Sequence, residues 1–182
     1  PYFRQVRAMM SVDGTYDLQE YLRYPSKWSQ ISKNIQKLVD MNLDSMLLTI
    51  TPVLQTTNIN RITELFDYIE DINKSVNRTA IHITPIMCNE PHHLDFLYLP
   101  LEYKIKCWEK IEQWTKTKCK HQAYYFIKRL SFIKNKCYAE VDYKENLSKF
   151  FEYTDIFDKH TMLGSFNHYN IKQDRKSTRL NS

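Results

Sequence analysis

Apolar and polar side chains in the first hundred residues alternate between two periods, that of a β-strand and that of an α-helix. Segments 7–13, 46–50 and 80–87 are short and rich in apolar residues, and they are predicted to be strands. Segments 26–42 and 58–73 carry apolar side chains three or four positions apart, which predicts two amphipathic helices. A β-α-β-α-β order favours parallel strands joined by right-handed helical crossovers, so the predicted fold class is α/β.

Three local features refine this expectation. Ser26 follows Pro25 and is predicted to cap the first helix. Pro52 closes the strand at 46–50, whose apolar run is typical of a strand buried on both faces of a parallel sheet. Such a sheet needs cover on both faces and protected edges, so we expect either further strands before Pro1 or an exposed edge at strand 7–13.

After Pro100 the pattern is helical and strongly basic. Residues 102–136 hold ten Lys and Arg against three Glu, a net charge of +7, and a last helix is predicted over 145–159. The aromatic side chains among these cations are Trp108, Trp114, Tyr124, Tyr125 and Phe126. A basic aromatic helical module of this kind suits RNA or an acidic peptide. Aromatics at helical spacing usually pack into a core, which is the interpretation we favour, and no nucleic-acid partner is expected.

Composition excludes several classes of protein. The chain has 182 residues and a net charge of +5, and its mean hydropathy of −0.58 leaves no stretch of about 20 apolar residues for a membrane span. A cytoplasmic protein without a membrane partner is therefore expected. Gly14 and Gly164 are the only glycines, so neither a phosphate-binding loop nor a dinucleotide-binding loop is present.

Cysteine and histidine positions predict no metal site in this chain. The four cysteines, 88, 107, 119 and 137, lie too far apart for the spacing of zinc or cluster ligands, and free thiols are expected. His92 and His93 lie near Asp95, but adjacent side chains in an extended segment point to opposite sides, so no metal is assigned to them.

The two ends of the sequence suggest that it is part of a longer protein. Pro1 leads almost directly into a strand pattern, so we expect that something preceded it. Residues 174–182 read Asp-Arg-Lys-Ser-Thr-Arg-Leu-Asn-Ser, which is one reading frame of a common sequencing adapter. We interpret this tail as non-native and leave it out of the fold prediction.

Candidate chemistry lies where the predicted strands end, because ligands of α/β folds bind beyond the carboxyl ends of the strands. Ser11 and Asp13 share one face there, and a hydroxyl beside a carboxylate suits a ribose diol. The simpler interpretation is that Asp13 begins an Asp-Gly turn. Arg23 is a candidate for bidentate binding of a carboxylate, with a solvated surface arginine as the alternative.

The run Ser11-Val12-Asp13-Gly14, followed by Tyr21-Leu22-Arg23-Tyr24-Pro25 and Trp28, resembles the second half of radical S-adenosylmethionine (SAM) enzymes of the branch with SPASM or twitch regions. The stretch 91–104 resembles the segment after the sixth strand of that branch. The resemblance covers about residues 5–165 and implies the C-terminal half of a partial (β/α)6 TIM-like barrel over 1–100. A helical, twitch-like region over 101–173 would follow.

The same resemblance implies a SAM site. Ser11 would approach the ribose, Arg23 would bind the SAM carboxylate, and backbone near Ile86 and Met87 would contact adenine. Thr51 occupies the position of the family's fifth-strand motif. Thr51 and Asp13 are the remaining residues of the implied SAM site. In the family a [4Fe-4S] cluster passes one electron to SAM and cleaves it to methionine and a 5′-deoxyadenosyl radical, which abstracts a hydrogen from a substrate; a peptide is the candidate substrate here.

One essential motif of that family is absent from the sequence. The C-x-x-x-C-x-x-C loop that ligates the cluster does not occur, and it would lie before Pro1. The expected function is therefore that of a part of a radical SAM enzyme, inactive by itself.

Overall fold

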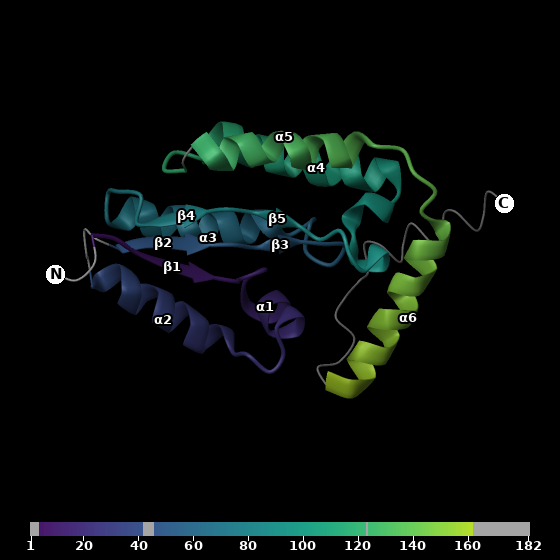
Figure 1. Cartoon of the computed structure of the whole chain (residues 1–182), viewed down its shortest axis with the longest axis horizontal. Coiled ribbons are helices and arrows are strands. Elements are labelled where there is room, and N and C mark those ends of the chain that lie inside the picture. The colour runs from purple at the N-terminus through teal and green to yellow at the C-terminus, as the bar shows by residue number, and fades with distance from the viewer. Residues whose placement is uncertain (1–3, 42–45, 123, 162–182) are drawn as a thin grey trace.

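The computed structural model describes residues 4–41, 46–122 and 124–161, and it shows a mixed α/β chain whose second half is helical (Figure 1). Three parallel strands form the main sheet in the order β1-β2-β4, and a two-stranded parallel sheet joins β3 to β5. The elements are β1 (Val6–Met10), α1 (Tyr16–Leu22), α2 (Trp28–Asp40), β2 (Met46–Ile50), β3 (Val53–Leu54), α3 (Ile62–Ser75), β4 (Ile81–Ile83), β5 (Ile86–Met87), the 3₁₀ turns η1 (His92–Leu94) and η2 (Phe96–Tyr98), α4 (Leu101–Thr117), α5 (Tyr124–Tyr138) and α6 (Lys144–Thr161).

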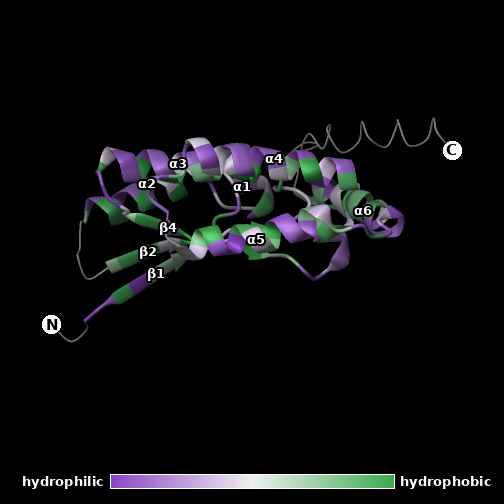
Figure 2. Ribbon diagram, turned by 90° about the horizontal axis from the view of Figure 1, so that it is seen from above, coloured by the Kyte–Doolittle hydropathy of each residue, from purple (hydrophilic) through white to green (hydrophobic). Residues whose placement is uncertain are grey.

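Both helical crossovers of the main sheet step in the same direction, from β1 to β2 and from β2 to β4. Right-handed crossovers that step the same way place their helices on the same face of a sheet. Figure 2 shows α2 and α3 together on one side of the strands. The strand residues that join α2 and α3 in the core come in register-matched rows, Ala8, Leu48 and Ile81, then Met10, Ile50 and Ile83.

The opposite face of the sheet is less well covered. Its register-matched row is Met9, Thr49 and His82, of which Met9 is 66% exposed, His82 half-buried and Thr49 buried. Arg7, two residues before Met9 on the same face, is also exposed. Parallel sheets normally have both faces covered, so a sheet with helices on one face is an incomplete layer.

The two edges of the main sheet differ. The side chain of Gln122 covers the outer edge of β4, because its Oε1 accepts a hydrogen bond from Ile83 N at 2.9 Å. Its Nε2 donates to the Ile81 carbonyl at 3.4 Å, and the Asn73 amide bonds to the N–H and the carbonyl of Ile81, so two side-chain amides replace a neighbouring strand. At the other edge β1 has no strand partner beyond β2 within the described residues, and Val6 is 48% exposed. The expected exposed edge is thus observed at β1.

Substituting Gln122 by alanine is expected to lower the free energy of unfolding by about 1–2 kcal/mol, because Ile83 N–H loses its acceptor at a half-buried edge. Urea unfolding followed by circular dichroism measures the change. Gln113→Ala, on the exposed side of α4, is the matched control and is expected to stay within about 0.5 kcal/mol of the parent chain. Equal values for the two variants would contradict the edge-capping role of Gln122.

Proline interrupts one predicted strand and ends another where expected. The prediction of one strand over 80–87 is wrong in detail, since β4 and β5 are separate and Thr84 and Pro85 lie between them. Pro52 separates β2 from β3 in the same way. Proline has no N–H to donate to a strand ladder, which explains both breaks.

The chain between β1 and α2 also departs from the prediction. β1 ends at Met10 rather than at Asp13, and the unpredicted helix α1 follows. Ser26 does not cap α2, because the helix begins at Trp28 and the amide of Trp28 donates to Glu20 Oε1 at 3.0 Å. A carboxylate from α1 therefore accepts the hydrogen bond that a serine hydroxyl was expected to accept.

The helical second half packs its aromatic side chains inward. Phe66 of α3 contacts both Trp114 and Phe126, with ring centroids 5.1 and 5.3 Å away. Trp108 is also buried. The expectation of inward packing is thereby confirmed for Trp108, Trp114 and Phe126, while Tyr125 is 74% exposed. Helix α6 agrees with the helix predicted over 145–159.

Candidate functional site

Asp13 is the centre of a polar cluster at the carboxyl ends of the strands. Its side chain is buried, and its two oxygens are both engaged within the chain. Arg23 Nε donates to Oδ2 at 2.6 Å, and the backbone N–H of Val53 donates to Oδ1 at 2.7 Å. The carboxylate therefore ties the loop after β1 to the end of α1 and to the start of β3.

Two buried amide side chains hold the loop around Asp13. Gln19 Oε1 accepts from the N–H groups of Asp13 and Gly14, at 2.8 and 3.2 Å. Asn58 Nδ2 donates to the carbonyls of Asp13 and Val53, at 2.9 and 2.8 Å. A Cβ at Gly14 would lie 2.7 Å from Leu18 Cγ, so the close approach of this loop to α1 requires glycine.

A pocket of about 240 Å³ opens beside this cluster. Asp13 and Arg23 line it together with polar residues of the segment after β3 and with side chains of α6. Arg23 is 40% exposed at its side chain, and within the described residues its contact is the one that Nε makes with Asp13. The other lining residues are Tyr21, Leu22, Val53, Gln55, Thr57, Leu94, Tyr153 and Phe157.

The structure brings some of the predicted site residues together and leaves others apart. Asp13 and Arg23 meet at the pocket, as a shared site requires. Ser11 is exposed just after β1, outside the pocket lining. Thr51 also lies outside the lining, and its Oγ1 is buried without a hydrogen-bond partner in the described part of the chain.

The residues predicted to contact adenine lie on β5. Ile86 pairs with Val53, and its N–H donates to the Pro52 carbonyl at 2.8 Å. Ile86 is 47% exposed and Met87 is half-buried, and neither lines the pocket. They adjoin the pocket only through the pairing of β5 with β3.

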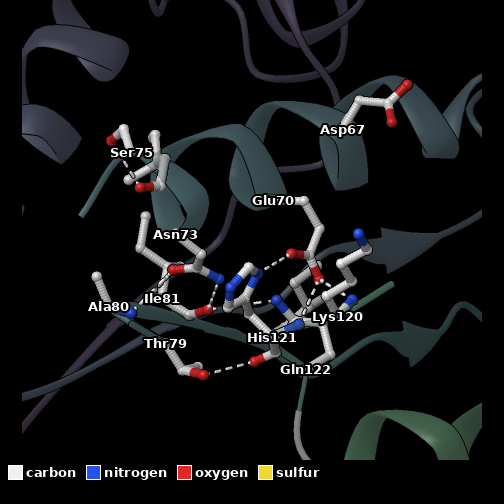
Figure 3. Close-up of polar contacts among 12 residues, drawn as sticks. Asp67, Glu70, Asn73, Ser75, Thr79, Ala80, Ile81, Lys120, His121 and Gln122 are labelled. Atoms are coloured by element: carbon white, nitrogen blue, oxygen red, sulfur yellow. Dashed lines mark hydrogen bonds and ion pairs between the residues drawn. The ribbon is translucent and has the colours of Figure 1, made fainter. Parts of the chain in front are cut away.

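A second polar cluster, which the sequence did not indicate, lies between α3 and the α4–α5 connection (Figure 3). Glu70 is buried, and its Oε1 accepts from the N–H groups of Lys120 and His121, at 3.2 and 3.1 Å. Its Oε2 lies 2.7 Å from His121 Nδ1. These bonds anchor the connection that carries Gln122 to the edge of β4, so the cluster has a clear structural role even though it borders a pocket of about 470 Å³.

Metal-binding groups are lacking in the part of the chain that the structure describes, where no three His, Cys, Asp or Glu side chains gather in a way that could hold an ion. The four cysteines are free thiols. Burial raises the pKa of the Cys107 and Cys137 thiols to about 12, so they stay protonated at neutral pH and are poor ligands. His93 packs against Tyr153, with ring centroids 5.2 Å apart.

Comparison with protein-family models, with curated proteins and with solved structures gives no match for this chain. In addition, none of the helices within 4–41, 46–122 and 124–161 combines the length and the apolar character that crossing a membrane requires.

Proposed function

We propose that this chain is the SAM-binding C-terminal part of a radical SAM enzyme. Its partial TIM-like barrel would be completed by strands that the described residues do not include. The sheet supports this proposal, because each successive strand is added on the same side of the one before it. The connecting helices lie on one face, as in one half of a barrel. The exposed part of the sheet at Met9 and the open β1 edge are where the missing strands would belong.

The observation that carries the proposal is the placement of Arg23 at the strand-end pocket. Asp13 holds Nε and thereby fixes the plane of the guanidinium, which leaves the terminal nitrogens to pair with a ligand carboxylate. The apolar residues Val53 and Leu94 line the same pocket and would contact the methylene groups of the SAM amino-acid chain.

The size of the pocket limits what this part of the chain can enclose. At about 240 Å³ it lies below the usual range of roughly 300–1,000 Å³ for sites that enclose a small molecule. It suits the amino-acid moiety of SAM, while the nucleoside would lie outside, toward Ser11 and the strand ends. When bound, SAM supplies the radical that removes a hydrogen from a substrate.

The described residues do not fit an iron–sulfur cluster, because they contain no suitable group of ligands. The proposal therefore assigns binding and orientation of SAM to this chain, and no electron transfer. Arg23 binds the carboxylate, Asp13 positions Arg23, and Tyr153 and Phe157 of α6 limit the access of water from one side of the pocket.

Titration calorimetry of the full 182-residue chain with SAM tests this proposal. Saturable binding is expected, and Arg23→Gln is expected to weaken it about 10-fold or more, since a charge-assisted hydrogen bond is lost. The same variant should bind 5′-methylthioadenosine, which lacks the carboxylate, as well as the parent chain does. Arg129→Gln, on the exposed side of α5, is the matched control and should leave SAM binding unchanged.

Two results would overturn the proposal. One is the absence of saturable SAM binding up to about 1 mM. The other is an equal loss of SAM affinity in Arg23→Gln and Arg129→Gln, which would mean that the affinity depends only on the net charge of the chain.

A further inference from the structure

Helix α5 has a buried face and an exposed face of different chemistry. Phe126, Leu130, Ile133 and Cys137 are all at most 5% exposed, and they follow each other at intervals of three and four residues. This stripe packs into the core with α4 and α3. The continuous apolar face of α5 is therefore already used inside the molecule.

The exposed face carries two aromatic rings with two cations between them. Tyr125 is 74% and Phe132 48% exposed, and Lys128 and Arg129 are exposed between them. Positions 125, 128, 129 and 132 follow helical spacing, so they share one face, and the two rings lie about 10 Å apart along the helix. Figure 2 shows α5 on the outside of the molecule, with hydrophilic and hydrophobic stretches in turn.

The cations of this face have no counter-charge within ion-pair distance in the described part of the chain. Helix α5 contains no Asp or Glu, and Lys128 and Arg129 have no ion-pair partner among the described residues. On the neighbouring α4, Glu112 is paired with Lys116 at 3.0 Å. Two free cations flanked by exposed rings thus remain on the surface of α5.

We propose that this exposed face binds single-stranded nucleic acid, with bases stacked on Tyr125 and Phe132 and backbone phosphates held by Lys128 and Arg129. Exposed rings accept any base, and cations between them match the charge of a phosphodiester backbone. This site is independent of the SAM pocket, because it shares no residue with it.

Two other partners fit the face less well. An amphipathic acidic helix would need an apolar groove for its anchoring side chains, whereas the two rings stand apart on a convex helix surface, with cations between them. A lipid surface would need a continuous apolar stripe turned outward, and the stripe of α5 is buried.

Fluorescence anisotropy with labelled oligouridine RNA of about 12 nucleotides tests the proposal on the full chain. A Kd of roughly 1–100 μM at physiological salt is expected, with a steep salt dependence. The double variant Lys128→Gln/Arg129→Gln should weaken binding and reduce the slope of log Kd against log salt by about 1.4, the value for two lost phosphate contacts on a single strand. Tyr125→Leu and Phe132→Leu should each weaken binding about 5-fold or more, since they remove a ring and keep apolar volume.

The matched control for charge is Lys33→Gln/Lys37→Gln on the exposed side of α2, and the control for a ring is Tyr138→Leu, on another face of α5. Both controls are expected to bind as the parent chain does. The proposal is overturned if the α2 variant loses as much affinity as the α5 variant, or if loss of either ring has no effect. It is also overturned if the chain binds phosphatidylserine vesicles but not the RNA.

Discussion

Substituting Asp13 by alanine is expected to lower the free energy of unfolding by about 3 kcal/mol. The substitution leaves the N–H of Val53 without an acceptor, at a cost of about 1–3 kcal/mol. It also removes the charge-assisted bond from Arg23, which adds the lower end of about 1.5–3 kcal/mol because Arg23 is 40% exposed and can turn to water. Urea unfolding at neutral pH measures the total.

Asp13→Asn separates the acceptor from the charge. An asparagine oxygen can still accept from Val53 N–H, so this variant is expected to lose about half as much stability as Asp13→Ala. Asp71→Ala, on the exposed side of α3, is the control and should change stability by less than about 0.5 kcal/mol. If Asp13→Ala also stays within that limit, the carboxylate does not tie the loop to β3 and the description of the site fails.

The fold was predictable where a single local pattern decides the structure. The run 46–50 is apolar and bounded by Pro52, and β2 has those limits. The start of α2 was not predictable in this way, because the group that accepts from Trp28 N–H is Glu20, a side chain of a helix that the pattern did not reveal. Contacts between elements, rather than propensity, decide such boundaries.

The candidate site was also predictable only where local sequence decides it, and not where contacts between elements do. Asp13 was identified at a strand end and Arg23 as a candidate for binding a carboxylate, and their contact follows from the position of α1. Sequence alone left open whether Asp13 forms a turn or binds a ligand. In the structure its oxygens accept hydrogen bonds from Arg23 and Val53. Gln19 and Asn58, which fix this loop, carry no sequence motif, since a buried amide is recognised only by the backbone groups that it meets.

The free energy of unfolding is expected to fall by about 3 kcal/mol between pH 8 and pH 10 through two buried thiols. Burial raises the pKa of Cys107 and Cys137 from 9.0 to about 12. Above pH 9 the unfolded chain therefore loses thiol protons that the folded chain keeps, so stability falls as the pH rises, up to about pH 12. Each thiol contributes about 1.4 kcal/mol by pH 10.

Urea unfolding at pH 8, 9 and 10, under reducing conditions, measures this slope. The variant Cys107→Ala/Cys137→Ala is expected to lose most of the slope, and its lower starting stability from the two cavities does not affect that comparison. Cys119→Ala, at a half-buried thiol whose pKa is raised to about 11, is the single-thiol comparison, and it should remove about half as much of the slope as the double variant. Lys104 acts in the opposite direction, because burial lowers its pKa, and it is present in every variant compared.

An unchanged slope in the double variant would mean that the two thiols ionise in the folded chain near their ordinary pKa of 9.0. They would then be available as thiolates, and the conclusion that they are poor ligands would fail. Loss of the slope, in contrast, identifies both as neutral core side chains between α4 and α5. Cluster ligands for the proposed radical chemistry would then have to come from residues other than these two.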